Sequence, residues 1–359
     1  MDENVLNILK RDNISQILMK WYDENKRCLP WRETTDSYLI WVSEVILQQT
    51  RVAQGLNYYL QFIDKFPTVD VLAQSLEIDV LKAWQGLGYY SRARNLHEGA
   101  KTVVSLFNGQ LPETHKEILS IKGIGEYTAA AILSIAFNKN YAVVDGNVFR
   151  VLSRLFAIET PIDSSEGKKI FSTLAQELLD ISHPGKYNQA IMEFGALHCT
   201  PTQPLCCSCP LQHLCMAKQL NMQTEFPVKS KKIKVRKRYF HYFQIEYNGF
   251  TFINKRVGDD IWRNMYDFPL IETKDEANLS DLMDTEFFKT LFADSDITFH
   301  INPKQFKHIL THQHIYAKFY LVKASKLNDN FNLNFLKIKT RDVSLYPIPR
   351  LIHRYLQQM

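Results

Sequence analysis

Four cysteines near the middle of the sequence are spaced closely enough to share one metal site. They follow the pattern C-x6-C-x2-C-x5-C, at Cys199, Cys206, Cys209 and Cys215. Four cysteines in a short span are typical of iron–sulfur clusters, and pairs of short cysteine spacings are typical of structural zinc sites. The spacing alone leaves both metals open. Two disulfides are less expected than a metal site, because nothing in the sequence marks a secreted protein.

Two carboxylates, Glu44 and Asp145, lie where a carboxyl group could take part in catalysis. Glu44 falls within residues 41–50, a helical stretch whose apolar residues leave few faces for polar groups. Partial burial would raise the pKa of Glu44 and let it donate a proton at neutral pH. The simpler alternative is a solvated helix face. Asp145 precedes a helical pattern at residues 148–155, and an N-cap is the default role of an aspartate there.

A glycine-containing turn between two helices could bind a phosphate group. A capping-box pattern starts the first helix, which is expected to run to about Lys122. Gly123 and Gly125 then leave the backbone of a tight hairpin uncovered before an alanine-rich helix. Exposed amides at a helix N-terminus suit a phosphate. This arrangement is typical of a helix-hairpin-helix that binds a nucleic-acid backbone.

The elements that must position these residues fall into two regions. The 359 residues are 45% hydrophobic and 23% charged, which is typical of a globular protein with room for two domains. Residues 1–220 have the three-and-four spacing of helices. Residues 221–238 contain a basic stretch that is expected to be an interdomain linker. The net charge of +5 permits a polyanionic partner.

Residues 239–359 have a different pattern and are expected to form an α+β domain. Two strand-like segments, at residues 239–246 and 250–255, flank Asn248-Gly249, a dipeptide that favours the positive φ angles of a tight hairpin turn. Apolar residues after Pro349 predict a closing helix. No run of about 18 apolar residues occurs, so no membrane span is expected.

Several motifs occur together in a characteristic order. They are LPWR at residues 29–32, SEVILQQT at 43–50, GLGYYSRARN at 86–95, the glycine hairpin, VDGNV at 144–148 and the cysteine quartet. In this order they resemble the MutY-type adenine DNA glycosylases of the endonuclease III superfamily. The resemblance covers nearly the whole chain. It implies an all-α helix-hairpin-helix glycosylase domain with a [4Fe–4S] cluster in the loop at residues 199–215, followed by a Nudix-like lesion-recognition domain.

The resemblance implies a monofunctional DNA glycosylase that flips adenine out of the duplex and cleaves its glycosidic bond, where adenine is mispaired with 8-oxoguanine or guanine. Glu44 would protonate the departing base. Asp145 would stabilise or trap the oxocarbenium-like sugar, a division of labour known from glycoside hydrolysis. Asn147 would help to orient the site. Tyr127 stands where bifunctional relatives carry a catalytic lysine, so no Schiff base is expected.

The resemblance also assigns residues to binding of the base and of the DNA. The implied adenine pocket consists of Trp31, Arg32, Leu47 and Gln189. The implied DNA contacts are Gln49 and Tyr89, which would wedge into the base stack, and Lys122, Gly123 and Gly125 at the hairpin. Without the resemblance, core packing is the simpler interpretation of Trp31 and Tyr89. Lys122 departs from the family, which often has proline there.

The C-terminal region departs from related domains in two ways. No glutamate-rich Nudix box occurs in residues 239–359, so pyrophosphate hydrolysis is not expected. The lesion-reading loop of the family usually ends in Phe-Ser-His, and here it reads Leu310-Thr311-His312. The hydroxyl and the imidazole are kept, whereas the aromatic ring is lost. These three residues are expected to recognise the 8-oxoguanine opposite adenine.

Two alternatives remain open. One is a bifunctional, endonuclease III-like pyrimidine-lesion glycosylase and lyase, which Tyr127 and the extra domain disfavour. The other is a non-catalytic, metal-stapled DNA-binding protein, which the presence of both Glu44 and Asp145 in their motifs disfavours. The expected partner is double-stranded DNA carrying adenine opposite 8-oxoguanine or guanine. The expected protein is a cytoplasmic, nucleoid-associated monomer of bacterial type that does not bind membranes.

Overall fold

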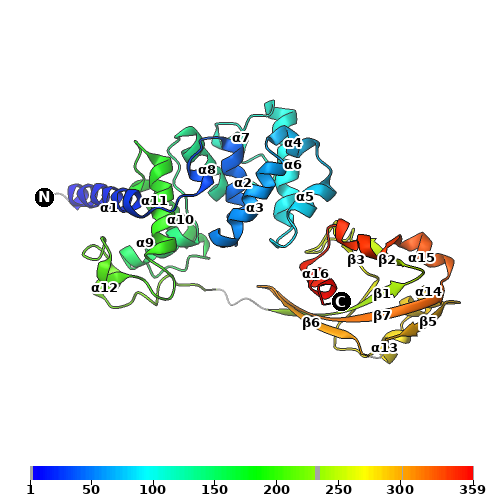
Figure 1. Ribbon diagram of the computed structural model, residues 1–359. Coiled ribbons are helices and arrows are strands. Elements are labelled where there is room, and N and C mark those ends of the chain that lie inside the picture. The colour runs from blue at the N-terminus through cyan, green and yellow to red at the C-terminus, as the bar shows by residue number, and fades with distance from the viewer. Residues whose placement is uncertain (1–2, 231–234, 301, 359) are drawn as a thin grey trace. The chain divides into compact units, whose positions relative to one another are not determined.

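The structure, a computed structural model, describes residues 3–230, 235–300 and 302–358 (Figure 1). The chain divides into two compact units. The first unit comprises Met1–Gln74 and Asn95–Lys231, and the second comprises Ser75–Arg94 and Lys232–Met359. Part of the predicted linker, residues 231–234, lies outside the described residues. The linker and the domain boundaries therefore stay a prediction.

The first unit is helical throughout its described residues, as expected. Its longer helices are α1 (Glu3–Asn25), α2 (Ser37–Leu47), α3 (Val52–Lys65), α6 (Ser91–Phe107), α8 (Glu126–Phe137), α9 (Gly146–Phe156), α10 (Ser165–Leu178) and α11 (Pro184–Leu197). Its short helical segments are η1 (Pro30–Arg32), α4 (Val69–Gln74), α7 (His115–Ile118), η2 (Cys206–Ser208) and α12 (Met216–Gln219). The first turn of α6 belongs to the second unit. No helix among the residues described is long and apolar enough to cross a membrane.

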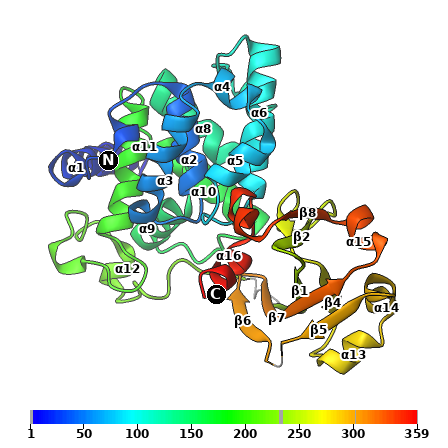
Figure 2. The same ribbon diagram turned by 45° about the vertical axis from the view of Figure 1, so that its right-hand side comes forward.

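One hydrophobic core joins helices that are far apart in the sequence. Leu18, Ala131, Leu152, Phe171 and Ile191, from α1, α8, α9, α10 and α11, are all buried in it. In turn, α2 packs against α8, and α8 and α9 pack against α11 (Figure 2). Because α2 and α8 are buried on most of their surface, polar residues such as Glu44 and Thr128 are enclosed by the packing.

The glycine hairpin starts as predicted but has a shorter first helix. The side chain of Thr114 accepts a hydrogen bond from the Glu117 amide, which confirms the predicted cap. The helix α7 ends at Ile118, so the prediction that it runs to Lys122 was wrong. The backbone tightens instead into hydrogen bonds of the i to i+3 type after Glu117. Gly123 has a φ of +90°, and a Cβ there would lie 2.8 Å from the Cβ of Asn95. Both constraints require glycine.

The second unit combines two sheets with short helices, which confirms the expected α+β class. The strands are β1 (Arg236–Glu246), β2 (Phe250–Lys255), β3 (Tyr266–Asp267), β4 (Leu270–Thr273), β5 (Asp296–Phe299), β6 (Lys304–Ile309), β7 (Gln313–Lys326) and β8 (Leu336–Lys339). The helical segments are α5 (Glu77–Ala83), α13 (Leu279–Met283), α14 (Glu286–Phe292), α15 (Asp329–Asn334), η3 (Thr340–Leu345) and α16 (Arg350–Leu356). The larger sheet has the order β4-β1-β7-β5, with β6 also paired to β7, and the smaller has the order β3-β2-β8.

The predicted Asn248-Gly249 turn forms, but the two strands beside it do not make a hairpin ladder. Both residues have positive φ angles, and one bridge joins Tyr247 to Phe250. Beyond the bridge, β1 and β2 enter different sheets. The reason is burial on both faces of β1, because its residues 240–245 are all buried. A strand buried on both faces is central, and β1 pairs with β4 and with the parallel strand β7.

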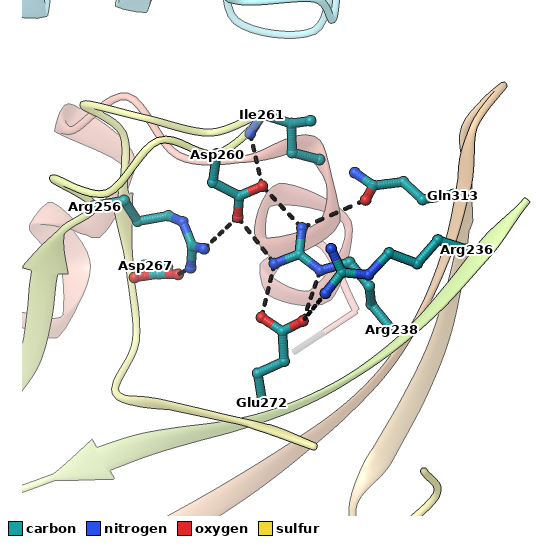
Figure 3. A network of polar contacts seen from close by, with 8 residues as sticks. All are labelled: Arg236, Arg238, Arg256, Asp260, Ile261, Asp267, Glu272 and Gln313. Atoms are coloured by element: carbon teal, nitrogen blue, oxygen red, sulfur yellow. Dashed lines mark hydrogen bonds and ion pairs between the residues drawn. The ribbon is translucent and has the colours of Figure 1, made fainter. Parts of the chain in front are cut away.

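A network of charged side chains stabilises the start of β1 (Figure 3). The Arg238 guanidinium donates to Glu272 through Nε at 2.7 Å and to Asp260 through Nη1 at 2.8 Å. Arg256 binds Asp260 as well and donates to Asp267 at 2.6 Å. Because each of these acids has an arginine partner, the network can remain ionised away from bulk water.

Candidate active site

A cavity of about 330 Å³ opens in the first unit between η1, α2, α8, α9 and α11. Nine of the residues singled out from the sequence line it: Trp31, Arg32, Glu44, Leu47, Gln49, Tyr127, Asp145, Asn147 and Gln189. Some of these residues lie more than a hundred positions apart in the chain. Their convergence brings the residues predicted for catalysis and for base binding to one site.

Glu44 is a buried acid with a neutral hydrogen-bond partner. Its carboxyl is on the inner side of α2 and the residue is 8% exposed. The Tyr127 hydroxyl donates to Glu44 Oε2 at 2.6 Å. Burial raises the pKa of Glu44 to about 7, and this effect outweighs the Tyr127 hydrogen bond, which lowers it. A carboxyl with this pKa still holds a proton near neutrality and can act as a general acid.

Asp145 combines both interpretations offered by the sequence. It is the N-cap of α9, since its Oδ1 accepts from the backbone amides of Asn147 at 2.9 Å and Val148 at 2.8 Å. Its Oδ2 accepts from Asn147 Nδ2 at 2.7 Å. It also lines the cavity that holds Glu44. Burial raises the pKa of Asp145, and these hydrogen bonds oppose that rise. The cap therefore fixes a carboxyl group at the cavity wall.

An ion pair that the sequence analysis missed holds Arg32, one of the residues predicted to bind the base. Glu193 is 1% exposed and accepts from Arg32 Nη1 at 2.8 Å and Nη2 at 2.7 Å. It also accepts from Arg27 Nε at 2.8 Å. Burial raises the pKa of Glu193, but hydrogen bonds from the two arginines outweigh burial and lower it to about 2. Glu193 therefore stays ionised and holds Arg32 at the cavity.

A weak sequence signal points to part of this cluster. Glu193 follows Gln189 by four positions on α11, so the two lie on one helix face. Gln189 is itself fixed, because its Oε1 accepts from the Tyr22 hydroxyl at 2.5 Å. For Arg27 we find no signal in the sequence. Trp31 is 6% exposed and packs edge-on against Tyr59, with ring centroids 5.1 Å apart. It is thus a core residue that also lines the cavity.

The other residues predicted to contact DNA lie outside this cavity: Tyr89, Lys122, Gly123 and Gly125. Gly125 is the N-cap of α8, and Lys122 is exposed on the turn before it. In the second unit, Tyr89 is 43% exposed and its hydroxyl lies 3.2 Å from Thr311 Oγ1. Gln49 and Tyr89 both have positive φ angles, 57° and 47°. Non-glycine residues rarely adopt such angles, and those that do cluster at functional sites.

The lesion-reading candidates form the tip of the β6–β7 hairpin. The Leu310 amide donates to the Gln313 carbonyl at 2.9 Å, which closes the turn. Thr311 and His312 are exposed, and Leu310 is half-buried. The two polar side chains are therefore accessible to a ligand, as recognition of a base would require.

The four cysteines of the quartet line one small cavity of about 30 Å³ together with Arg154 and His198. All of them are free thiols. Arg154 is 2% exposed and donates to the carbonyls of Thr200 at 2.7 Å and Pro201 at 2.9 Å, and to Cys199 Sγ at 3.4 Å. Within the described residues, no group of three or more His, Cys, Asp or Glu side chains is arranged to hold a single metal ion. Four cysteine side chains at one cavity are a donor set that suits an iron–sulfur cluster.

Comparisons with known proteins identify the family of this chain. Residues 42–177 match the HhH-GPD superfamily of base excision DNA repair proteins, and residues 241–358 match the NUDIX domain family. An adenine DNA glycosylase of Buchnera aphidicola subsp. Baizongia pistaciae is 33% identical over 322 residues, which cover 89% of this chain and 88% of that protein. This chain belongs to the adenine DNA glycosylase family.

Mammalian members of the family are more similar in sequence over a shorter region. The human adenine DNA glycosylase is 47% identical over 211 residues, which cover 56% of this chain and 39% of that protein. The chain spans about two fifths of the length of the human, rat and mouse relatives that it matches. The full-length bacterial relative therefore carries the family assignment.

Solved structures support the fold of the helical unit. A thermostable thymine-DNA glycosylase aligns with a TM-score of 0.55 and 29% identity, covering 59% of this chain and 97% of that chain. A non-covalent endonuclease III–DNA complex aligns with a TM-score of 0.51 and 22% identity, covering 59% and 98%. The second likeness shows the fold alone. The predicted helix-hairpin-helix glycosylase unit and Nudix-like unit are both confirmed.

Proposed function

We propose that this chain is a monofunctional DNA glycosylase that removes adenine mispaired with 8-oxoguanine or guanine in base excision repair. The observation that carries the proposal is the cavity in which Glu44, an acid with a pKa of about 7, lies with Asp145 and a base-sized pocket. The printed names of the family members, adenine DNA glycosylase, indicate the same base.

Cleavage of the bond between adenine and deoxyribose develops charge on both fragments, and both charges must be stabilised. The leaving purine must gain a proton, and the sugar, which develops oxocarbenium character, must be stabilised from the other side. Glu44 donates the proton, since it remains protonated to about pH 7. Asp145 supplies the negative charge, and water completes the hydrolysis. Asn147 and the α9 amides hold the Asp145 carboxylate in place.

The flipped adenine would be held by the wall opposite the acids. Trp31 and Leu47 offer apolar surface to the ring, and Arg32 and Gln189 offer groups that bond to its polar edge. Glu193 and Tyr22 fix these two polar side chains before the base arrives. Fixed donors raise the rate because no rearrangement is needed during the reaction.

We further propose that the DNA backbone is gripped at the hairpin by Lys122 and the amides around Gly123 and Gly125. Lys122 is exposed, and no Cβ covers the backbone at Gly125, the N-cap of α8. Gln49 and Tyr89 would fill the space that the flipped base leaves. Thr311 and His312, with Leu310 beside them, would distinguish 8-oxoguanine from guanine on the opposite strand.

We also propose that Cys199, Cys206, Cys209 and Cys215 hold a [4Fe–4S] cluster. When bound, the cluster would staple the loop between α11 and α12, and Arg154 already holds that loop through two backbone carbonyls. Protein prepared anaerobically should be yellow-brown and contain about four irons per chain. Stoichiometric zinc in place of iron would contradict this assignment.

The substrate proposal is tested with a panel of duplexes. The full chain is incubated with DNA carrying adenine opposite 8-oxoguanine, adenine opposite guanine, or thymine glycol, and base release and strand cleavage are followed separately. We expect adenine release, fastest opposite 8-oxoguanine, with strand breaks only after alkali. Release of thymine glycol with a borohydride-trapped covalent complex would instead show an endonuclease III-like lyase. Binding without release from any duplex would show a non-catalytic protein.

A further inference from the structure

One end of the larger sheet in the second unit carries aromatic and basic side chains that lie outside the described hydrophobic core of the unit. In the ladder between β1 and β7, Tyr239 lies opposite Tyr316 and His241 opposite Lys318. In the ladder between β6 and β7, Lys307 lies opposite Tyr316. Residues that are paired across neighbouring strands point to the same face of a sheet. These five side chains therefore share one face, and we call them the sheet platform.

The same face is covered farther along the strands. Phe243 and Tyr320 continue the alternation of β1 and β7, and they pack with Phe288, Leu291 and Phe292 of α14 in a hydrophobic core. Helix α14 therefore covers Phe243 and Tyr320, whereas Tyr239 and Tyr316 are half-buried and Lys307 is exposed. Figures 1 and 2 show α13 and α14 at the far end of the sheet from the β6–β7 turn.

The sheet platform lines a cavity of about 420 Å³. The rings of Tyr239 and Tyr316 are stacked, with centroids 5.3 Å apart and planes at 18°. Lys307 Nζ lies 5.2 Å from the centre of the Tyr316 ring. A flat aromatic pair with a cation beside it can stack a planar base and attract its phosphate.

A buried imidazole at the cavity supports a ligand site. His241 is 1% exposed, and its Nε2 lies 3.1 Å from Thr273 Oγ1. Its Nδ1 has no hydrogen-bond partner among the described residues. Buried polar atoms are rarely left unpaired, so this atom can accept or donate a bond to a bound molecule. The positive charge of Lys318 is balanced by Glu276 at 3.0 Å, which leaves Lys307 as the main cation facing solvent.

We propose that the sheet platform binds single-stranded DNA, with one base stacked on the Tyr239–Tyr316 pair and a phosphate beside Lys307. Exposed aromatic rings interspersed with basic side chains on an open sheet are the usual means of binding an unpaired strand, because every base has a face that can stack. The cavity is lined by residues 305–307 of β6 and 316–318 of β7, the two strands that the turn at Leu310-Thr311-His312 joins. A strand on the platform would thus extend the surface that reaches the lesion-reading tip.

The test uses the full chain and a fluorescein-labelled oligothymidylate of about ten nucleotides, within the range of sites for single strands. Binding is followed by anisotropy while unlabelled duplex saturates the helical unit. We expect Tyr316→Ala and Lys307→Glu each to raise Kd roughly tenfold, and Tyr316→Phe to bind as the wild type does, because stacking needs the ring and not the hydroxyl. Lys323→Glu, the same charge change at the other end of β7, should leave Kd unchanged.

Several outcomes would overturn this proposal. Unchanged binding by Tyr316→Ala and Lys307→Glu would do so, and so would an equal loss in Lys323→Glu, which would indicate net charge alone. Competition by free dAMP as strong as that by the oligonucleotide would indicate a mononucleotide site. Independently, oligonucleotides containing 5-iodouracil should photocrosslink to the peptides of Tyr239 or Tyr316. Crosslinks in the helical unit alone would contradict the proposal. Adenine excision by the wild type is measured separately and tests only the proposed glycosylase function.

Discussion

Glu44 in the first unit is buried and Asp260 in the second is half-buried, and their acid strengths differ widely. The partner of Glu44 is the neutral hydroxyl of Tyr127, and burial raises the pKa of Glu44 to about 7. Asp260 accepts from Arg238 and Arg256 (Figure 3). Burial raises the pKa of Asp260 as well, but the two arginines outweigh it and lower the pKa to about 2.

The comparison shows that the charge of the partner, and not burial alone, decides what a buried acid can do. A neutral donor leaves the carboxyl able to hold a proton, whereas a cation keeps it ionised as an anchor. Glu193 follows the second pattern inside the same cavity as Glu44. Asp267 lies between the two patterns. It is 3% exposed, and burial raises its pKa to about 6 although Arg256 donates to it at 2.6 Å.

The largest expected effect comes from removing the proton that Glu44 holds. In Glu44→Gln the amide keeps the shape of the side chain but cannot protonate adenine, so excision should fall by about 10²–10⁴-fold. Duplex binding should largely survive, because backbone contacts supply much of the affinity. Single-turnover excision and a binding titration on the same duplex separate the two. Excision near the wild-type rate would remove Glu44 from the mechanism.

The second effect concerns the anchoring acids. Arg238→Met removes the cation while preserving much of the length of the side chain, and it leaves Asp260 and Glu272 with fewer partners. Breaking a buried ion pair of this kind should lower the free energy of unfolding by about 3 kcal/mol. The matched control is Arg236→Met, because Arg236 is 72% exposed and lies 3.8 Å from Glu272. That change should cost less than about 1 kcal/mol.

Urea titration read by hydrogen exchange in β1 peptides measures the second unit by itself. A larger loss of unfolding free energy in Arg238→Met than in Arg236→Met would support the anchoring role of the network. Equal stability of the two variants would show that the network does not anchor the unit.

A smaller effect is expected at the tip of the β6–β7 hairpin. His312→Ala should reduce the preference for 8-oxoguanine over guanine as the opposite base, because the polar group of the lesion that His312 would bind loses its partner. The loss corresponds to about 1–3 kcal/mol of discrimination. The ratio of excision rates on the two duplexes measures it, with Lys323→Glu as a surface control. Full discrimination by the His312 variant would mean that this tip does not read the lesion.

The sequence predicted the parts of the site that lie in contiguous motifs. The burial of Glu44 and the capping role of Asp145 can be read locally, whereas Tyr127 was identified through the resemblance, and the structure brings all three to one cavity. The pair of Arg27 and Glu193 was missed, since its members are 166 positions apart and neither lies in a motif. Long-range partners depend on helix packing, which local patterns do not reveal.

The fold shows the same limit. Two domains of different class follow from helical spacing in one region and turn signals in the other, and both classes are confirmed. The partners of β1 could not be predicted from its turn with β2, because burial on both faces makes β1 a central strand. The end of α7 was also missed, because the chain leaves the helix at Ile118 and continues in hydrogen bonds of the i to i+3 type.

The pH dependence of single-turnover adenine excision opposite 8-oxoguanine tests the central claim most directly. Because the pKa of Glu44 is raised to about 7, its proton is fully present at lower pH and is lost as pH rises through that value. The rate should therefore fall about tenfold per pH unit above about pH 7, and it should also fall at acidic pH, where Asp145 gains a proton and loses the charge that it supplies. Tyr127→Phe removes the hydrogen bond that lowers this pKa, so its decline should begin at higher pH. A wild-type rate that already declines as pH rises through 4.5, the ordinary pKa of a glutamate, would contradict the assignment of Glu44 as the acid. A rate that does not decline at any higher pH would contradict it as well.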